Sequence, residues 1–241
     1  MNLNDRIGQW LIDLRQRSGT LASKCELAGR PIVTLSYAQT WDGSITTVPG
    51  KTLALSSQAS KAMTHALRSW HDGILIGIGT LIADDPLLTV REWRGANPQP
   101  IVLDSKQGFP ADSKVCRENN RKPWVLSNSK LENDQINYEQ IVVGSDKRGR
   151  VDLELAMEAI YARGIKTLMV EGGADVISSF IAARLADAII LTIAPMLVGG
   201  YKAVNTLTGD TSFPRIAALN SHQQGDEMIL WGEIDYQDKP N

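Results

Sequence analysis

The chain has 241 residues, 43% of them apolar, and its 25 basic and 27 acidic side chains leave a formal net charge of −2. A chain of this length can bury a sizeable core in one large domain or two small ones. Because the charges nearly balance and no long run of lysine or arginine occurs, the sequence lacks the basic excess of proteins whose main partner is nucleic acid.

The cysteines and the hydropathy of the sequence indicate the cellular compartment of the protein. Cys25 and Cys116 belong to no CxxC or Cys/His cluster, so we expect neither a disulfide framework nor a metal site. Charged side chains interrupt the N-terminal segment, which argues against a secretory leader, and the longest mostly apolar run, residues 188–198, is well short of the ~20 residues of a membrane helix. We therefore expect a cytoplasmic protein without a membrane partner.

The first predicted element is an amphipathic helix near the N-terminus. Its apolar face follows a candidate cap, Asn4, with the helical spacing i, i+3, i+4 and i+7 at Ile7, Trp10, Leu11 and Leu14. A polar stretch, residues 17–30, comes next. The pattern predicts a helical appendage and linker over residues 1–30 and a main domain over residues 31–241.

From residue 31 onward, short apolar strands alternate with amphipathic helices. Strands are predicted at residues 32–35, 73–79, 100–104, 123–127, 167–170, 188–194 and 228–234. Helices are predicted at residues 58–70 after a Ser57 cap, at 153–160 before Gly164, and at 174–181. This order predicts an α/β fold with a mixed, mainly parallel sheet that is flanked by helices and gains antiparallel strands late.

Gly172 and Gly173 stand between a predicted strand and the start of a helix. Free backbone N–H groups and the positive end of the helix dipole favour a phosphate at such a point, and the missing side chains let it approach closely. The alternative is a turn that uses glycine for a positive φ or for tight packing, and the local sequence favours neither interpretation.

A second glycine pair, Gly77 and Gly79, also ends a strand, but Ile82 stands where the dinucleotide fingerprint requires its third glycine. The loop that follows, residues 80–91, holds adjacent carboxylates, a proline and an arginine, and α/β proteins bind ligands in such loops. Solvated acids at Asp84 and Asp85 and a surface ion pair at Arg91 are the alternative.

Other catalytic signatures are absent from the sequence. His65, His71 and His222 have no flanking pattern of a general base, and His65 and His71 are predicted to be surface or core histidines. Neither a GxSxG elbow nor a zinc deaminase signature occurs. We therefore expect the chemistry to come from a cofactor or from isolated carboxylates and hydroxyls.

Several motifs together resemble the reductase domain of riboflavin biosynthesis, the C-terminal half of the bifunctional deaminase/reductase. The most specific is the block G-T-x-x-A-D-D-P-x-L-T-V-R over residues 79–91. It occurs with D-G at 42–43, L-R at 67–68, V-L-D-S at 102–105, V-E-G-G at 170–173 and A-P-M-L-V-G-G at 194–200, in the order of that family. The resemblance covers roughly residues 31–236.

The resemblance implies a dihydrofolate-reductase-like fold, a homodimer and an NADPH-dependent oxidoreductase. The reaction it implies converts the ribosylamino group of a pyrimidine 5′-phosphate, deaminated or still diamino, to the ribitylamino form. Family positions for the cofactor match Ala38, Thr80, Asp84 and Ser105, and the glycine hinge with the next helix, Gly173 to Ser179, matches the diphosphate site. The cofactor residues expected in that segment and beside it are Gly172, Gly173, Ala174, Asp175 and Val176. Ser105 and Lys106 suit a 2′-phosphate.

For the substrate, the resemblance implies contacts at Thr52, Arg68, Leu88, Arg91 and Glu171. The two arginines suit a clamp on the ribose phosphate. Glu171 and Asp42 are the candidate catalytic residues, with water as the alternative proton source. The family's substrate-contacting serine is Thr52 here, and its cofactor-stacking tryptophan is Ala54. A related reductase of a pterin or folate-like substrate, and a noncatalytic partner of a separate deaminase, therefore remain alternatives.

Overall fold

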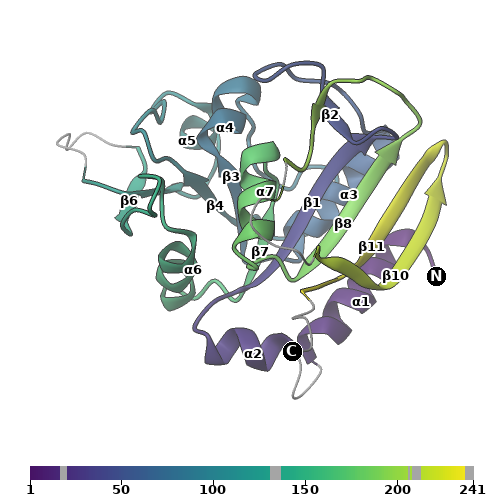
Figure 1. Cartoon of the computed structure of the whole chain (residues 1–241), viewed down its shortest axis with the longest axis horizontal. Coiled ribbons are helices and arrows are strands. Elements are labelled where there is room, and N and C mark those ends of the chain that lie inside the picture. The colour runs from purple at the N-terminus through teal and green to yellow at the C-terminus, as the bar shows by residue number, and fades with distance from the viewer. Residues whose placement is uncertain (17–20, 131–136, 206, 208–212, 237–241) are drawn as a thin grey trace.

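The computed structural model describes residues 1–16, 21–130, 137–205, 207 and 213–236, and its largest feature is one nine-stranded sheet (Figure 1). The order across this sheet is β10-β11-β8-β1-β7-β3-β4-β5-β6. Every neighbouring pair from β8 to β6 is parallel, whereas β11 runs antiparallel to β8 and β10 antiparallel to β11. The mixed, mainly parallel sheet with late antiparallel strands is therefore confirmed.

Seven of the nine strands of this sheet coincide with predicted apolar runs, whereas β6 and β10 were not predicted and β1 extends beyond its predicted end. The nine strands are β1 (Ile32–Thr40), β3 (Gly73–Gly77), β4 (Gln99–Leu103), β5 (Trp124–Ser127), β6 (Glu139–Val142), β7 (Thr167–Val170), β8 (Ala188–Ala194), β10 (Arg215–Gln224) and β11 (Glu227–Asp235). A small second sheet pairs β2 (Ser44–Thr46) with β9 (Tyr201–Lys202). The central strands are buried on both sides, as parallel strands covered by helices must be.

Helices cover both faces of the sheet. On one face, α6 (Leu153–Ala162) and α7 (Ala174–Ala182) pack against Leu75, while α4 (Ile78–Asp84) and α5 (Lys114–Arg117) pack against Ile74 and Ile76 on the other. The alternation of these three β3 residues between two clusters is the two-residue period of a strand. Figure 1 shows α7 in front of the central strands and α3 (Gln58–Ser69) behind them. Ser57 caps α3 through its hydroxyl, as predicted.

The N-terminal helix α1 (Leu3–Gln16) confirms the predicted amphipathic element, with a different cap. The side chain of Asn2, and not that of Asn4, accepts the N–H of Asp5 at 2.9 Å. The apolar face of α1 belongs to a core cluster that includes Met63 of α3 and Trp231 of β11. A short helix, α2 (Leu21–Leu27), lies within the polar stretch. The division into residues 1–30 and 31–241 stays a prediction.

One predicted loop is partly helical. The buried run that begins at Gly73 ends as a strand at Gly77, and α4 occupies the next residues as far as Asp84. Asp85 then adopts a left-handed conformation, with φ of 40°, and ends the helix. No helix in the described ranges is long and apolar enough to cross a membrane.

Candidate functional site

A cavity of about 1120 Å³ opens at the carboxyl ends of the parallel strands, where ligands bind in open α/β sheets. It brings together all but two of the residues expected at the site. Those residues are Ala38, Thr52, Arg68, Thr80, Asp84, Arg91, Ser105, Glu171, Gly172, Gly173, Ala174, Asp175 and Val176. Asp42 and Leu88 do not line it.

The glycine hinge joins β7 to α7 at the cavity wall. Neither glycine has a positive φ. A Cβ on Gly172 would lie 2.7 Å from Cβ of Val176, so close packing requires a glycine at this position. A Cβ on Gly173 would meet only the Thr80 hydroxyl, at 3.4 Å, on the cavity side. Gly173 is also the N-cap of α7 and makes no side-chain cap, which leaves the first N–H groups of the helix free for an anion.

Arg68 of α3 and Glu171 at the end of β7 form a bidentate ion pair that lines the cavity. Nε to Oε1 and Nη2 to Oε2 are both 2.7 Å, and Arg68 Nη1 donates to the carbonyl of Thr89 at 3.0 Å. Burial of Arg68 opposes its charge, but the Glu171 carboxylate prevails and raises the pKa of the guanidinium. The predicted pair of phosphate-clamping arginines is thus split, because Arg68 is neutralised by Glu171 while the exposed side chain of Arg91 keeps a free charge.

Thr52 and Asp84 both line the cavity and connect two segments of the chain. The Thr52 hydroxyl, in the segment between β2 and α3, donates to the carboxylate of Asp84 at the end of α4. Ala54 also lines the cavity and is exposed, so no aromatic ring from this position covers the cavity here.

The loop after β4 places a hydroxyl and an ammonium group at the cavity wall. The buried carboxylate of Asp104 accepts the N–H groups of Lys106 at 3.1 Å and Phe109 at 2.8 Å, and thereby fixes the turn. The Ser105 hydroxyl oxygen accepts the N–H of Val151 at 2.9 Å. No described residue accepts the hydroxyl hydrogen of Ser105, which therefore stays available to a ligand.

Arg150 is a cavity residue that the sequence analysis missed. It lies in a turn closed by the Ser145 to Val151 bridge, and its Nη1 donates to the Ser179 hydroxyl of α7 at 3.2 Å. Its ion pair with Asp146, at 3.0 Å, is half exposed. Nothing in the local sequence marks Arg150, because its approach to Ser105 and Lys106 depends on the long connection between β6 and α6.

Leu88 occupies the core instead of the cavity. Its side chain is 1% exposed and packs in the cluster of Ile74, Leu81 and Val102, and its φ of 56° is left-handed. A substrate contact through this side chain is therefore not available in the observed arrangement.

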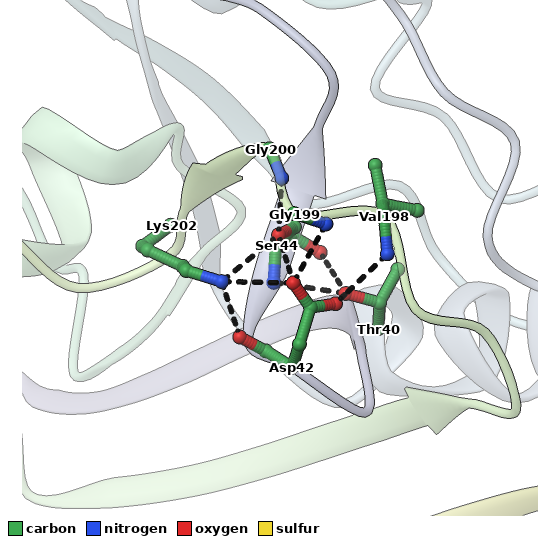
Figure 2. Close-up of polar contacts among 7 residues, drawn as sticks. All are labelled: Thr40, Asp42, Ser44, Val198, Gly199, Gly200 and Lys202. Carbon is green, nitrogen blue, oxygen red and sulfur yellow. Dashed lines mark hydrogen bonds and ion pairs between the residues drawn. The ribbon is translucent and has the colours of Figure 1, made fainter.

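Asp42 lies in a turn between β1 and β2 and does not line the cavity. Figure 2 shows its polar contacts. Its carboxylate accepts from Lys202 Nζ at 2.8 Å, from the Thr40 hydroxyl, and from the backbone N–H groups of Val198 at 3.1 Å and Gly199 at 2.8 Å. Lys202, Thr40 and the Val198 amide hold the pKa of Asp42 well below its usual range. Both oxygens of this ionised carboxylate accept hydrogen bonds, and they connect the β1–β2 turn to the β8–β9 loop. The carboxylate has no proton to donate near neutral pH.

The fold and the cavity define a class: an α/β protein whose helix start and basic loops, at the carboxyl edge of the sheet, suit a large phosphate-bearing ligand. The sequence model of the RibD C-terminal domain matches residues 31–230, and the chain belongs to that family. The family resemblance is therefore confirmed.

Relatives of nearly the same length are named as reductases. The chain is 33% identical over 214 residues to the 2,5-diamino-6-ribosylamino-4(3H)-pyrimidinone 5′-phosphate reductase of Methanothermobacter thermautotrophicus, covering 83% of this chain and 97% of the relative. A protein of the same name from Aquifex aeolicus is 32% identical over 221 residues, with coverage of 85% and 97%.

Solved structures agree in fold. The riboflavin biosynthesis reductase Rib7 of Saccharomyces cerevisiae superposes with a TM-score of 0.74 at 26% identity, covering 95% of this chain and 99% of that one. RibD of Acinetobacter baumannii gives a TM-score of 0.78 at 23% identity, covering 88% of this chain and 60% of the other. The second match shows the shared fold alone.

Proposed function

We propose that this protein is an NADPH-dependent reductase of riboflavin biosynthesis that acts on 2,5-diamino-6-ribosylamino-4(3H)-pyrimidinone 5′-phosphate. The observation that carries the proposal is the relation to reductases of that name over almost their whole length. Among the two substrates that the family resemblance implies, these relatives favour the diamino compound over the deaminated one.

The cavity residues fit a nicotinamide dinucleotide with a 2′-phosphate. Gly173 leaves room beside Thr80 at the free N-terminus of α7, which suits the diphosphate. Ser105, Lys106 and Arg150 supply a hydroxyl and two positive charges on the same wall, and this favours NADPH over NADH. When bound, the cofactor supplies the hydride that reduces C1′ of the ring-opened ribosylamino group.

The residues of the chain then position the substrate and hold its charge. Glu171 faces the cavity and, held by Arg68, can accept hydrogen bonds from the ribose hydroxyls or the pyrimidine. Thr52, hydrogen-bonded to Asp84, is an exposed residue of the cavity lining. We assign the reaction proton to water, or to Glu171 once it has taken up a proton from water, because its carboxylate is ionised in the pair with Arg68. We give Asp42 the structural role of joining two loops.

The test is NADPH oxidation, followed by absorbance, with the purified protein and either the diamino or the deaminated ribosylaminopyrimidine phosphate. We expect turnover of the diamino compound and at most slow turnover of the other, with NADPH preferred over NADH. Faster reduction of the deaminated compound would show that the enzyme acts after deamination of the pyrimidine and not before it. NADPH binding without reduction of either compound would overturn the assignment and favour a different substrate.

A homodimer and a cytoplasmic location complete the proposal. Trp41 and Leu197 are 63% and 77% exposed, and the Trp41 N–H donates to the Met196 carbonyl at 2.9 Å, which brings both apolar side chains to one end of β1 and β8. Light scattering on the wild type and on Leu197→Ser tests the dimer. The free thiols of Cys25 and Cys116 agree with a reducing compartment.

A further inference from the structure

His65 of α3 is buried, with 5% of its surface exposed, yet it lines the cavity. Its Nδ1 is 3.0 Å from the backbone nitrogen of Arg91. A backbone N–H can only donate, so Nδ1 must present its lone pair. The ring is then neutral and carries its proton on Nε2. Burial and the charges of Arg68 and Arg91 lower the pKa of His65, which agrees with a neutral ring.

The Nε2–H group of His65 is open to the cavity. No described residue accepts its hydrogen bond. The fully enclosed polar atoms without a partner in the described residues are Asn4 Oδ1, Trp10 Nε1, Trp231 Nε1 and Tyr236 OH, and Nε2 of His65 is not among them. A donor that is held by a buried ring lining the cavity, and that is not fully enclosed, is positioned for a ligand acceptor.

Two cations stand beside this donor. Lys61 precedes His65 by one helical turn on the same face of α3, is exposed and lines the cavity. Arg91, whose backbone fixes the imidazole, directs Nη1 to the Thr89 hydroxyl at 3.0 Å and is exposed toward the same space. Of the nearby carboxylates, Glu171 pairs with Arg68, whereas Glu92 accepts only from the uncharged amide of Gln58, at 2.7 Å, among the described residues.

This donor set lies apart from the residues proposed for the phosphate groups of the cofactor. Helix α3 packs in the core cluster on one face of the sheet, and α7 packs in the cluster on the other. The glycine hinge, Ser105 and Arg150 adjoin α7, whereas His65 and Lys61 project from α3. Two anion-binding regions at opposite sides of one cavity suit a phosphorylated cofactor and a phosphorylated substrate.

We infer that His65, through Nε2–H, binds the phosphate of the substrate together with Lys61 and Arg91. The inference rests on the proposed function for the identity of the phosphate. It adds two phosphate-binding residues, His65 and Lys61, and makes His65 a positioning residue for Arg91 as well, since the imidazole fixes the backbone of that arginine.

Two substitutions separate the roles of the ring nitrogens. His65→Asn retains an amide oxygen near the place of Nδ1, so Arg91 keeps its acceptor while the Nε2 donor is lost. His65→Gln places its amide nitrogen near Nε2 and gives up the Nδ1 acceptor. Lys61→Gln removes the neighbouring charge. Lys24→Gln, an exposed lysine of α2 outside the cavity, is the matched control.

The readout is binding of ribose 5-phosphate to the NADPH-saturated protein, measured by calorimetry. Ribose without a phosphate is the uncharged comparison. We expect His65→Asn and Lys61→Gln each to weaken ribose 5-phosphate binding about tenfold, His65→Gln to weaken it less, and Lys24→Gln to leave it unchanged. The KM for the pyrimidine phosphate should rise by a similar factor while kcat changes little.

Two results would overturn the inference. One is a folded His65→Asn variant, with the melting temperature of the wild type, that binds ribose 5-phosphate as tightly as the wild type does. The other is wild-type turnover of the pyrimidine phosphate without ribose 5-phosphate binding, which leaves the proposed function intact. Binding of ribose 5-phosphate without turnover of either pyrimidine has the opposite meaning, because it retains the anion site and overturns the function.

Discussion

The guanidinium of Arg68 meets the carboxylate of Glu171 through two parallel hydrogen bonds, each 2.7 Å long, across 103 residues of sequence. The pair joins α3 to the end of β7 and lines the cavity. Both side chains are mostly buried, with 10% and 18% exposed, so each charge depends on the other. Stability and activity are therefore coupled at this point.

Removal of both partners of this pair should cost less than the sum of the two single removals. We expect Arg68→Gln and Glu171→Gln each to lower the free energy of unfolding by about 3 kcal/mol, because each leaves a buried charge unpaired, and the double variant to lose less than the sum. Urea unfolding of the four proteins measures the coupling. Additive losses would show that the charges are independently solvated.

The same Glu171→Gln variant tests the chemistry. If Glu171 orients the substrate or supplies the proton, turnover should fall at least about tenfold even under conditions where the variant is folded. Single-turnover NADPH oxidation on the folded fraction provides the measurement. Full turnover would exclude Glu171 as the acid and leave water in that role.

Asp42 offers a contrast to Glu171. Its hydrogen bonds to Lys202, Val198 and Gly199 make it a link between two loops, so Asp42→Asn should lower the melting temperature and leave kcat within a few-fold of the wild type. Lys202→Gln, which removes the partner charge, is the matched control. It should likewise lower the melting temperature and leave kcat within a few-fold of the wild type. A large loss of kcat in Asp42→Asn alone, at unchanged KM, would return Asp42 to the chemistry.

Cofactor preference should depend on Lys106 and Arg150. We expect Lys106→Gln and Arg150→Gln each to reduce the ratio of kcat/KM for NADPH over that for NADH by about tenfold, since each removes a charged donor from the 2′-phosphate. Asp146→Asn is the control, because it weakens the ion pair of Arg150 and keeps the cation. Unchanged ratios in both variants would place the 2′-phosphate elsewhere.

The sequence predicts the parts of this molecule that depend on local periodicity. The apolar face of α1, the Ser57 cap and the central strands all follow from residue patterns within one element. Helix α4 was missed because its seven residues begin directly after a strand, where glycines indicate a loop. The Arg68 to Glu171 pair and the approach of Arg150 are tertiary, and no local pattern carries them. The expectation for His65 considered only its flanking residues, although its spacing of three from Arg68 already placed it on the same helical face.

The glycines around Val176 should respond differently to substitution. A Cβ on Gly77 would meet only Cγ2 of Val176, at 2.7 Å, so the damage of Gly77→Ala should be relieved by Val176→Ala. Gly172→Ala should not be rescued, because its Cβ would meet Cβ of Val176 at 2.7 Å. Gly173→Ala should fold normally and lose NADPH affinity, since its Cβ enters the cavity. Melting temperatures and NADPH titrations decide these cases, and normal NADPH affinity in Gly173→Ala would argue against the diphosphate site.

His71 should make the fold sensitive to acid. The ring is buried, with Nδ1 2.7 Å from the carbonyl of Leu67 and Nε2 3.1 Å from the Thr34 hydroxyl, and burial together with the charge of Arg15 lowers its pKa to about 4. The unfolded chain takes up a proton below about pH 6.5, while the folded chain does not until about pH 4. The stabilisation is therefore complete above pH 6.5 and is lost as the pH falls toward 4, by about 3 kcal/mol in all. Urea unfolding across this range should show a shallower loss for His71→Gln than for the wild type. Arg15→Met, which removes the charge that lowers the pKa, should also reduce the loss, and a slope unchanged in both variants would assign the acid sensitivity to other groups.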